Sequence, residues 1–207
     1  MMRRWLYRFQ SNPILFAALT ILLLSVGFDA TYGAETGKPN GSAMEAPAGQ
    51  EFALRGQRAA RGIEYSDWRK FCFKTPGSNT VCRTTIAGTF ETGQSAVRID
   101  LIERDGDKAA RLQLFLPVGL YLQAGVKLTV DQGGSYRIPY VWCLTNTCIA
   151  ADLAEPQLLK EMETGQKLLL EVVDSSLIAV STTLPLNQFV PVWQGTPART
   201  FEQAIEE

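Results

Sequence analysis

The four cysteines are the residues best suited to chemistry in this chain, and they fall into two close pairs, Cys72/Cys82 and Cys143/Cys148. Four thiols can form structural disulfides, ligate a metal or work as redox-active dithiols. The sequence contains no histidine, so the commonest general base, proton shuttle and metal ligand is missing. The cysteines could therefore act only without a histidine partner, as disulfides, as thiolate metal ligands or as a dithiol.

Short loops favour pairing each cysteine with its neighbour in sequence. Cys72 and Cys82 flank a turn-rich segment at residues 74–79, and Cys143 and Cys148 enclose only residues 144–147. Of the three possible pairings, we expect the two sequential ones. Chain-entropy estimates for loops this short give roughly 2–3 kcal/mol of stabilisation for each disulfide.

Metal and redox roles fit the cysteines less well. A zinc site would need all four thiolates to converge, and gaps of nine and four residues match no common ligand spacing. Neither pair has the Cys-x-x-Cys spacing of a redox-active dithiol. The sequence therefore predicts two structural disulfides, with no metal and no small-molecule cofactor.

The sequence contains no specific catalytic arrangement. Without histidine there is no Ser-His-Asp or Cys-His set, and the chain has no Gly-rich phosphate loop. Glu103, Asp105 and Asp107 cluster where a hairpin turn is expected, which favours a solvated tip over a calcium site. We predict no catalytic residues and no enzyme activity, and a carboxylate-based hydrolase remains the less favoured alternative.

The N-terminus has the pattern of a secretory leader. Arg3, Arg4 and Arg8 precede an almost unbroken apolar run at residues 14–28, and small residues near Gly33 offer a cleavage site. We expect residues 1–33 to be a signal peptide removed near Ala34, the alternative being an uncleaved membrane anchor. Export would deliver the cysteines to an oxidising compartment, where they form disulfides.

Two segments flank the expected folded domain, which we place at residues 62–193. Residues 34–61 are rich in Gly, Ala, Pro and charge and predict a flexible linker, and residues 194–207 predict a polar tail. Removing residues 1–33 leaves 17 basic and 20 acidic residues, a net charge of −3. Such mild acidity gives no reason to expect nucleic acid as a partner.

Alternating apolar residues make most of the domain strand-like. Asp105-Gly106 separates two alternating runs and predicts a β-hairpin. Further strands are expected at 126–130, at 137–143 with Pro139 marking an edge or bulge, and at 167–173 and 177–184.

A single short helix is expected between these strands, with Asp152 or Glu155 as its cap, Pro156 in its first turn and Gly165 at its end. About eight short strands then predict an all-β domain with one short helix. We expect a disulfide-stapled β-sandwich or partly open barrel.

Aromatic residues near the cysteines allow two interpretations. Trp68, Phe71 and Phe73 could form a binding face, but core packing around the first disulfide is the favoured hypothesis. Trp142 and Trp193 fit either role equally well.

The order of these motifs resembles the invasion-associated locus B family of bacterial exported proteins. Asp67-Trp68-Arg69 precedes the first cysteine pair. The later motifs are Leu116-Pro117-Val118-Gly119, Gly125, Asp131 and the close pair from Cys143 to Ala150. The resemblance runs from about Tyr65 to Phe189. The chain departs from the family pattern at Asn146-Thr147, where the family tends to place a Gly before the cysteine, and in its extension beyond residue 193.

The resemblance implies a periplasmic or outer-membrane-associated protein with no known catalytic residues, linked in pathogenic members to host-cell entry. We therefore expect a non-enzymatic envelope protein that binds a protein partner or an envelope or host surface. A structural or stress-related periplasmic protein with no host role is the alternative. The sequence fixes neither the partner nor the oligomeric state.

Overall fold

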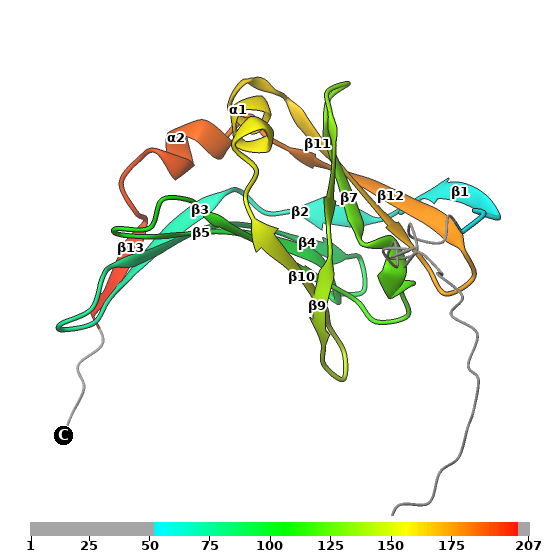
Figure 1. The fold of residues 1–207 in the computed structure, drawn as a ribbon, viewed down its shortest axis with the longest axis horizontal. Helices are drawn as coiled ribbons and strands as arrows, with labels where there is room; N and C mark the ends of the chain where they lie inside the picture. Colours follow the sequence, from blue (N-terminus) through cyan, green and yellow to red (C-terminus); the bar gives the residue numbers. More distant parts are fainter. Residues whose placement is uncertain (1–51, 203–207) are drawn as a thin grey trace, which may run out of the picture. The chain divides into compact units, whose positions relative to one another are not determined.

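Two β-sheets face one another and enclose a common apolar core (Figure 1). The structure is a computed structural model that describes residues 52–202, and the expected signal peptide lies outside the described residues. The two sheets remain open and do not close into a barrel, which confirms the predicted all-β class and selects the sandwich. The described residues form 13 strands instead of about eight.

The small sheet has five strands in the described part of the chain. In spatial order they are β1 (Gly56–Ala59), β12 (Ile178–Pro185), β11 (Lys167–Val173), β7 (Val126–Val130) and β8 (Ser135–Ile138). β1 pairs parallel with β12, and the other neighbours are antiparallel.

The large sheet has eight strands among the described residues. Seven of them follow the order β13 (Arg199–Glu202), β3 (Arg69–Lys74), β4 (Val81–Phe90), β5 (Ser95–Arg104), β6 (Arg111–Leu116), β10 (Cys148–Leu153) and β9 (Tyr140–Cys143). The eighth, β2 (Ile63–Tyr65), pairs with the end of β4. β13 lies parallel to β3 at one edge, and β9 forms the other edge.

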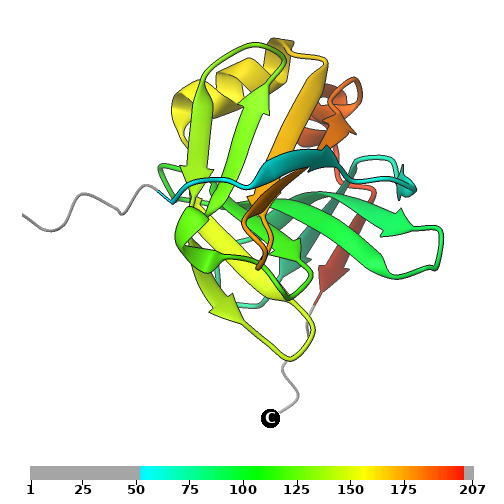
Figure 2. The same cartoon turned by 90° about the vertical axis from the view of Figure 1, so that its right-hand side faces the viewer.

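Short helices accompany the small sheet and one end of the sandwich (Figures 1 and 2). They are the 3-10 turn η1 (Leu122–Ala124), α1 (Pro156–Thr164) and α2 (Phe189–Trp193). α1 contacts β7, and α2 contacts both α1 and β3. α1 is the helix that the sequence predicted, although Glu155 at its N-cap position makes no side-chain capping bond.

The core lies between the inner faces of the two sheets. Leu112 and Leu114 of the large sheet and Leu168 and Leu170 of the small sheet are almost fully buried in one cluster. Phe189 of α2 joins the same cluster, so this helix closes one end of the core. Burial of this apolar surface is the main favourable term in holding the sheets together.

The predicted hairpin around Asp105-Gly106 is confirmed, because β5 and β6 pair antiparallel on either side of it. Gly106 has φ +89°, which a turn accepts most readily from glycine. The single strand expected at 137–143 is wrong. Pro139 separates β8 in the small sheet from β9 in the large one, so the chain changes sheet at this residue. Proline lacks the N–H that an unbroken strand would use in its ladder.

The folded unit reaches beyond the expected range of 62–193 at both ends. β1 lies within the segment expected to be a linker, and β13 lies within the expected tail. Both pair parallel with strands distant in sequence, which local composition does not signal.

The turn-forming Asp131 fastens the β7–β8 turn to the start of β11. Its carboxylate accepts hydrogen bonds from the backbone N–H groups of Gln166 and Lys167, both at 3.0 Å. Its own N–H donates to the carbonyl of Lys167 at 2.9 Å. Asp131 therefore holds together two neighbouring strands of the small sheet.

Candidate functional site

Each disulfide joins two residues that lie directly opposite one another on paired antiparallel strands. Cys72 bonds to Cys82 across β3 and β4, and Cys143 bonds to Cys148 across β9 and β10. These are the two sequential pairings expected from the short loops. Both staple the large sheet near one of its edges.

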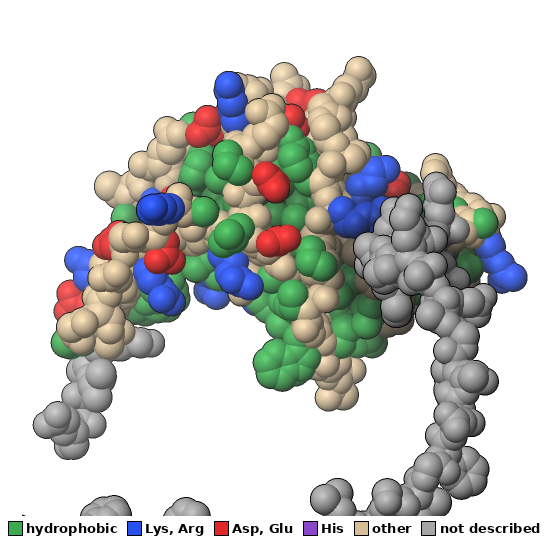
Figure 3. All heavy atoms as spheres, in the orientation of Figure 1, with side chains coloured by type: hydrophobic (Ala, Val, Ile, Leu, Met, Phe, Trp, Pro, Cys, Tyr) green, Lys and Arg blue, Asp and Glu red, His purple; other side chains and the backbone are tan. Residues whose placement is uncertain are grey.

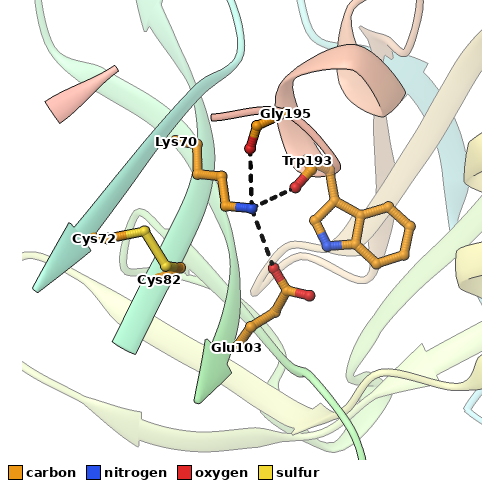
Figure 4. The surroundings of a disulfide bond; sticks show 6 residues. All are labelled: Lys70, Cys72, Cys82, Glu103, Trp193 and Gly195. Atoms are coloured by element: carbon orange, nitrogen blue, oxygen red, sulfur yellow. Dashed lines mark hydrogen bonds and ion pairs between the residues drawn. A yellow bond between two sulfur atoms is a disulfide. The ribbon is translucent and has the colours of Figure 1, made fainter. Parts of the chain in front are cut away.

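Lys70 lies beside the first disulfide, in a groove of about 590 Å³ (Figure 4). Its ammonium donates to the carbonyl of Trp193 at 2.6 Å and to that of Gly195 at 3.4 Å. Glu103 lies 4.0 Å away and completes the set. Lys70 therefore binds the carbonyls at the end of α2 and anchors the segment that leads into β13.

Three carboxylates, Glu103, Asp105 and Asp107, line this groove, and they differ in partner and exposure. Glu103 faces Lys70, while Asp105 and Asp107 lie exposed at the β5–β6 turn, as expected for a solvated tip. A second cavity, of about 250 Å³ and lined largely by apolar residues, contains Arg58 and Asp174. Hydrogen bonds from the N–H groups of Ile178 and Ser176, and the nearby Arg58, lower the pKa of Asp174. A carboxyl with a lowered pKa is unsuited to act as a general acid near neutral pH.

Within residues 52–202, no group of three or more acidic or cysteine side chains is placed to hold a metal ion. The same residues contain no helix long and apolar enough to cross a membrane.

Trp68 lies in the core, and its position explains why a tryptophan precedes the first cysteine. The side chain is 3% exposed, and its indole N–H donates to the carbonyl of Pro185 at 2.8 Å. Its ring packs edge-on against Phe189 with centroids 5.0 Å apart. Trp68 thus ties the start of β3 in the large sheet to the end of β12 in the small one.

The favoured hypothesis of core packing is wrong for Phe71 and Phe73. They lie on the outer face of the large sheet, because they alternate with the buried Cys72 along β3. Phe73 stacks on Phe201 of β13, with centroids 5.2 Å apart. The pairing of β13 with β3 therefore builds an aromatic cluster on this face.

Arginines occupy most of the remaining strands on the same face. The strand registers align one row of outward side chains as Arg199, Phe71, Arg83, Ile102, Arg111 and Leu153. A second row runs Ala87, Arg98, Phe115, Ile149 and Trp142. Arg69 and Arg104 also point outward from β3 and β5. We call these six arginines the arginine face; they are Arg69, Arg83, Arg98, Arg104, Arg111 and Arg199.

Asp100 lies within the arginine face and organises it. Its side chain is 2% exposed, and Arg83 and Arg98 approach its carboxylate at 3.8 and 3.3 Å. Arg83 makes its contact through Nη1, beyond hydrogen-bond distance, and Arg98 makes its contact through Nε, which has no hydrogen-bond partner. Both contacts are therefore ion pairs without hydrogen-bond geometry. Thr85 donates a hydrogen bond to the other carboxylate oxygen. Arg98 also stacks on Phe115, with its guanidinium carbon 3.7 Å from the ring centroid.

Exposed apolar residues gather where the large sheet ends at β9 (Figure 3). Trp142 is 66% exposed and Leu153 is 58% exposed, and Val141 and Leu144 are also more than half exposed. We call these four residues the β9 edge patch. Trp193, by contrast, stacks on Phe189 and packs against the core, so the two ambiguous tryptophans have opposite roles.

Tyr140 and Trp142 point to opposite faces of the large sheet at this edge. It lies across β10 from Ala150 and packs against the core, while Trp142 lies opposite Ile149 and points outward. Burial strongly raises the pKa of the Tyr140 hydroxyl. A register irregularity between Ile149 and Ala150 allows this arrangement.

The sequence predicted the pairing of the cysteines, but it did not predict the arginine face. Its signal is present in the strands, since Arg69, Arg83, Arg98 and Arg111 each alternate with inward-facing residues. Only the strand registers show that they share one face.

The fold and the two cross-strand disulfides define a class of small β-sandwich proteins in which disulfides link neighbouring strands of the large sheet. The family model of the Invasion associated locus B (IalB) protein matches residues 68–197, which is more than half of the chain, and the chain belongs to this family. The match extends past residue 193, so the family region includes the first residues of the expected tail.

A solved structure has the same fold. The crystal structure of invasion associated protein b from Bartonella henselae is 16% identical to this chain and has a TM-score of 0.53. The similarity covers 63% of this chain and 92% of that one. A search of curated proteins finds no match.

Proposed function

We propose that this chain is an exported protein of the bacterial envelope that binds a partner, without catalysis, through the outer face of its large sheet. The observation that carries the proposal is the β9 edge patch, in which Trp142 and Leu153 stand exposed on the same face as six arginines. Aromatic residues and arginine are enriched at binding interfaces.

The physical cost of this surface supports a binding role. Four large apolar side chains lie exposed along β9, β10 and the loop between them, where exposure gives them no stabilising burial. Exposed apolar patches that are rimmed by polar residues mark sites of interaction. An edge strand also presents unpaired backbone groups, which can pair with an added strand.

Export and the absence of enzyme activity form part of the same proposal. Two disulfides are typical of an oxidising compartment, which supports a periplasmic or outer-membrane-associated location. The leader pattern at residues 1–33 supports cleavage during export. The name of the Bartonella protein supports a contribution to host-cell invasion where the bacterium that produces this chain is a pathogen.

Site-specific photo-cross-linking in intact cells that export the protein tests the proposal. A photoreactive amino acid at position 142 should form adducts, because this position contacts the partner. The matched control replaces Thr183, which is exposed on β12 of the small sheet. Adducts at position 183 and none at position 142 would show that the binding surface lies elsewhere.

A further inference from the structure

We propose that the arginine face and the β9 edge patch together bind the surface of an anionic lipid bilayer, with arginines contacting headgroup phosphates. The inference rests on the proposed function, because it names the partner of the same surface.

Charge is distributed very unevenly over this protein. The chain has a formal net charge of −1, yet the outer face of the large sheet carries six arginines against two carboxylates, Asp100 and Glu64. Asp100 is buried, and Glu64 lies at the far end beside Thr89. The whole protein is therefore not attracted to anions, but this face is. A local field of one sign selects partners of the opposite sign.

The arginines are held in positions suited to phosphate. Arg98 stacks on Phe115 and Arg199 lies over Phe201, with the guanidinium carbon 4.8 Å from the ring centroid. Stacking on a ring covers the face of the guanidinium and leaves its edge available, and the N–H fork at this edge matches phosphate oxygens. In Arg98 the Nε approaches Asp100, so its terminal N–H groups are the ones left to bind a phosphate. Within one row, Arg199, Arg83 and Arg111 occupy alternate strands, so neighbouring arginines stand about 10 Å apart. The face thus offers several separate phosphate contacts instead of one pocket.

The apolar residues distinguish a bilayer from other polyanions. Leu153 follows Arg111 in one row and Trp142 shares the other row with Arg98, so exposed apolar side chains and arginines point the same way. Tryptophan lies preferentially at the level of the lipid headgroups, and leucine gains by entering the acyl region. A polysaccharide or a nucleic acid would offer Leu153 no comparable apolar environment.

Vesicle binding tests the inference on the protein purified after export, with its N-terminus sequenced to establish that no leader remains. Co-sedimentation is measured with vesicles of phosphatidylcholine alone and of phosphatidylcholine mixed equally with phosphatidylglycerol. The test variant is Arg69→Gln with Arg111→Gln, since both side chains are exposed on the arginine face. The matched control is Arg55→Gln with Arg61→Gln, which removes two exposed arginines outside the large sheet.

We expect binding only to the anionic vesicles, and binding that weakens as salt is added. A basic side chain near an anionic surface contributes about 1 kcal/mol, so losing two should weaken binding roughly 10- to 30-fold. The control variant should bind like the parent protein. A blue shift of tryptophan fluorescence on binding should disappear in Trp142→Phe.

Three results would overturn the inference. They are equal binding to neutral vesicles, equal loss in the test and control variants, and binding to heparin but not to anionic vesicles. Cross-linking from position 142 separates this failure from failure of the proposed function. If protein adducts form there while vesicles are not bound, the surface is a binding site for a different partner.

Discussion

Replacing Trp68 with alanine should destabilise the fold more than any comparable change at the surface. The variant leaves a cavity where a nearly fully buried indole packs against Phe189, and it removes the donor to the Pro185 carbonyl. Truncating a buried tryptophan to alanine costs about 3–5 kcal/mol. In a domain of this size, each kcal/mol lowers the melting temperature by about 2–4 °C, so a fall of roughly 10 °C is expected.

Two further variants separate the contributions. Trp68→Phe keeps an aromatic ring but loses the hydrogen bond, and should cost about 1–2 kcal/mol. Trp142→Ala is the matched control, because this indole is 66% exposed, and it should cost less than about 0.5 kcal/mol. Urea denaturation followed by far-ultraviolet circular dichroism measures all three. If Trp142→Ala proved as destabilising as Trp68→Ala, the assignment of Trp68 as the tie between the sheets would be refuted.

Three other predictions concern the disulfides, pH and processing. Chain entropy assigns about 2.7 kcal/mol to the Cys72–Cys82 link and about 2.1 kcal/mol to Cys143–Cys148, whose loops span 10 and 5 residues. The first double-serine variant should therefore melt at the lower temperature, and equal melting temperatures would count against this ordering. Because hydrogen bonds from Ile178 and Ser176 and the nearby Arg58 lower the pKa of Asp174, its contribution to stability is present above about pH 4 and is lost as pH falls through the folded-state pKa. Denaturation between pH 2 and 6 should show this loss, and Asp174→Asn should reduce it; an unchanged acid profile in that variant would remove Asp174 from the explanation. Exported protein should begin near Ala34 and show no alkylatable thiol before reduction, which N-terminal sequencing and mass spectrometry can check.

Local signals in the sequence predicted the parts of the fold that depend on neighbouring residues. Asp105-Gly106 favours a chain reversal through local backbone preferences, and Gly106 has φ +89° in the connection between β5 and β6. Pro156 and Gly165 bound α1 for equally local reasons. The short loops predicted both disulfides, since each cysteine needs only its opposite neighbour.

The parts of the fold that were not predicted depend on pairing between strands that lie far apart in the sequence. β1 and β13 are short, have little apolar alternation and form because β12 and β3 offer them an edge. Pro139 signalled a break, but the change from one sheet to the other depends on which partner strands are free.

The arginine face depends on long-range pairing most of all. Its six members come from five strands, and they share a face only because the registers bring them together. A net charge close to zero concealed this distribution, since acidic residues elsewhere balance the arginines.

Hydroxyl-radical footprinting in the native envelope is the most direct test of the claim that the outer face of the large sheet is the binding surface. Oxidation of each side chain is compared between exported protein in envelope preparations and the same protein after purification. Trp142, Leu153 and Phe201 should be protected in the envelope, because they lie on that face. Leu54 and Leu122, which are 41% and 40% exposed and lie outside the large sheet, should be oxidised equally in both samples. Protection of Leu54 and Leu122 with unchanged oxidation of Trp142 would contradict the account.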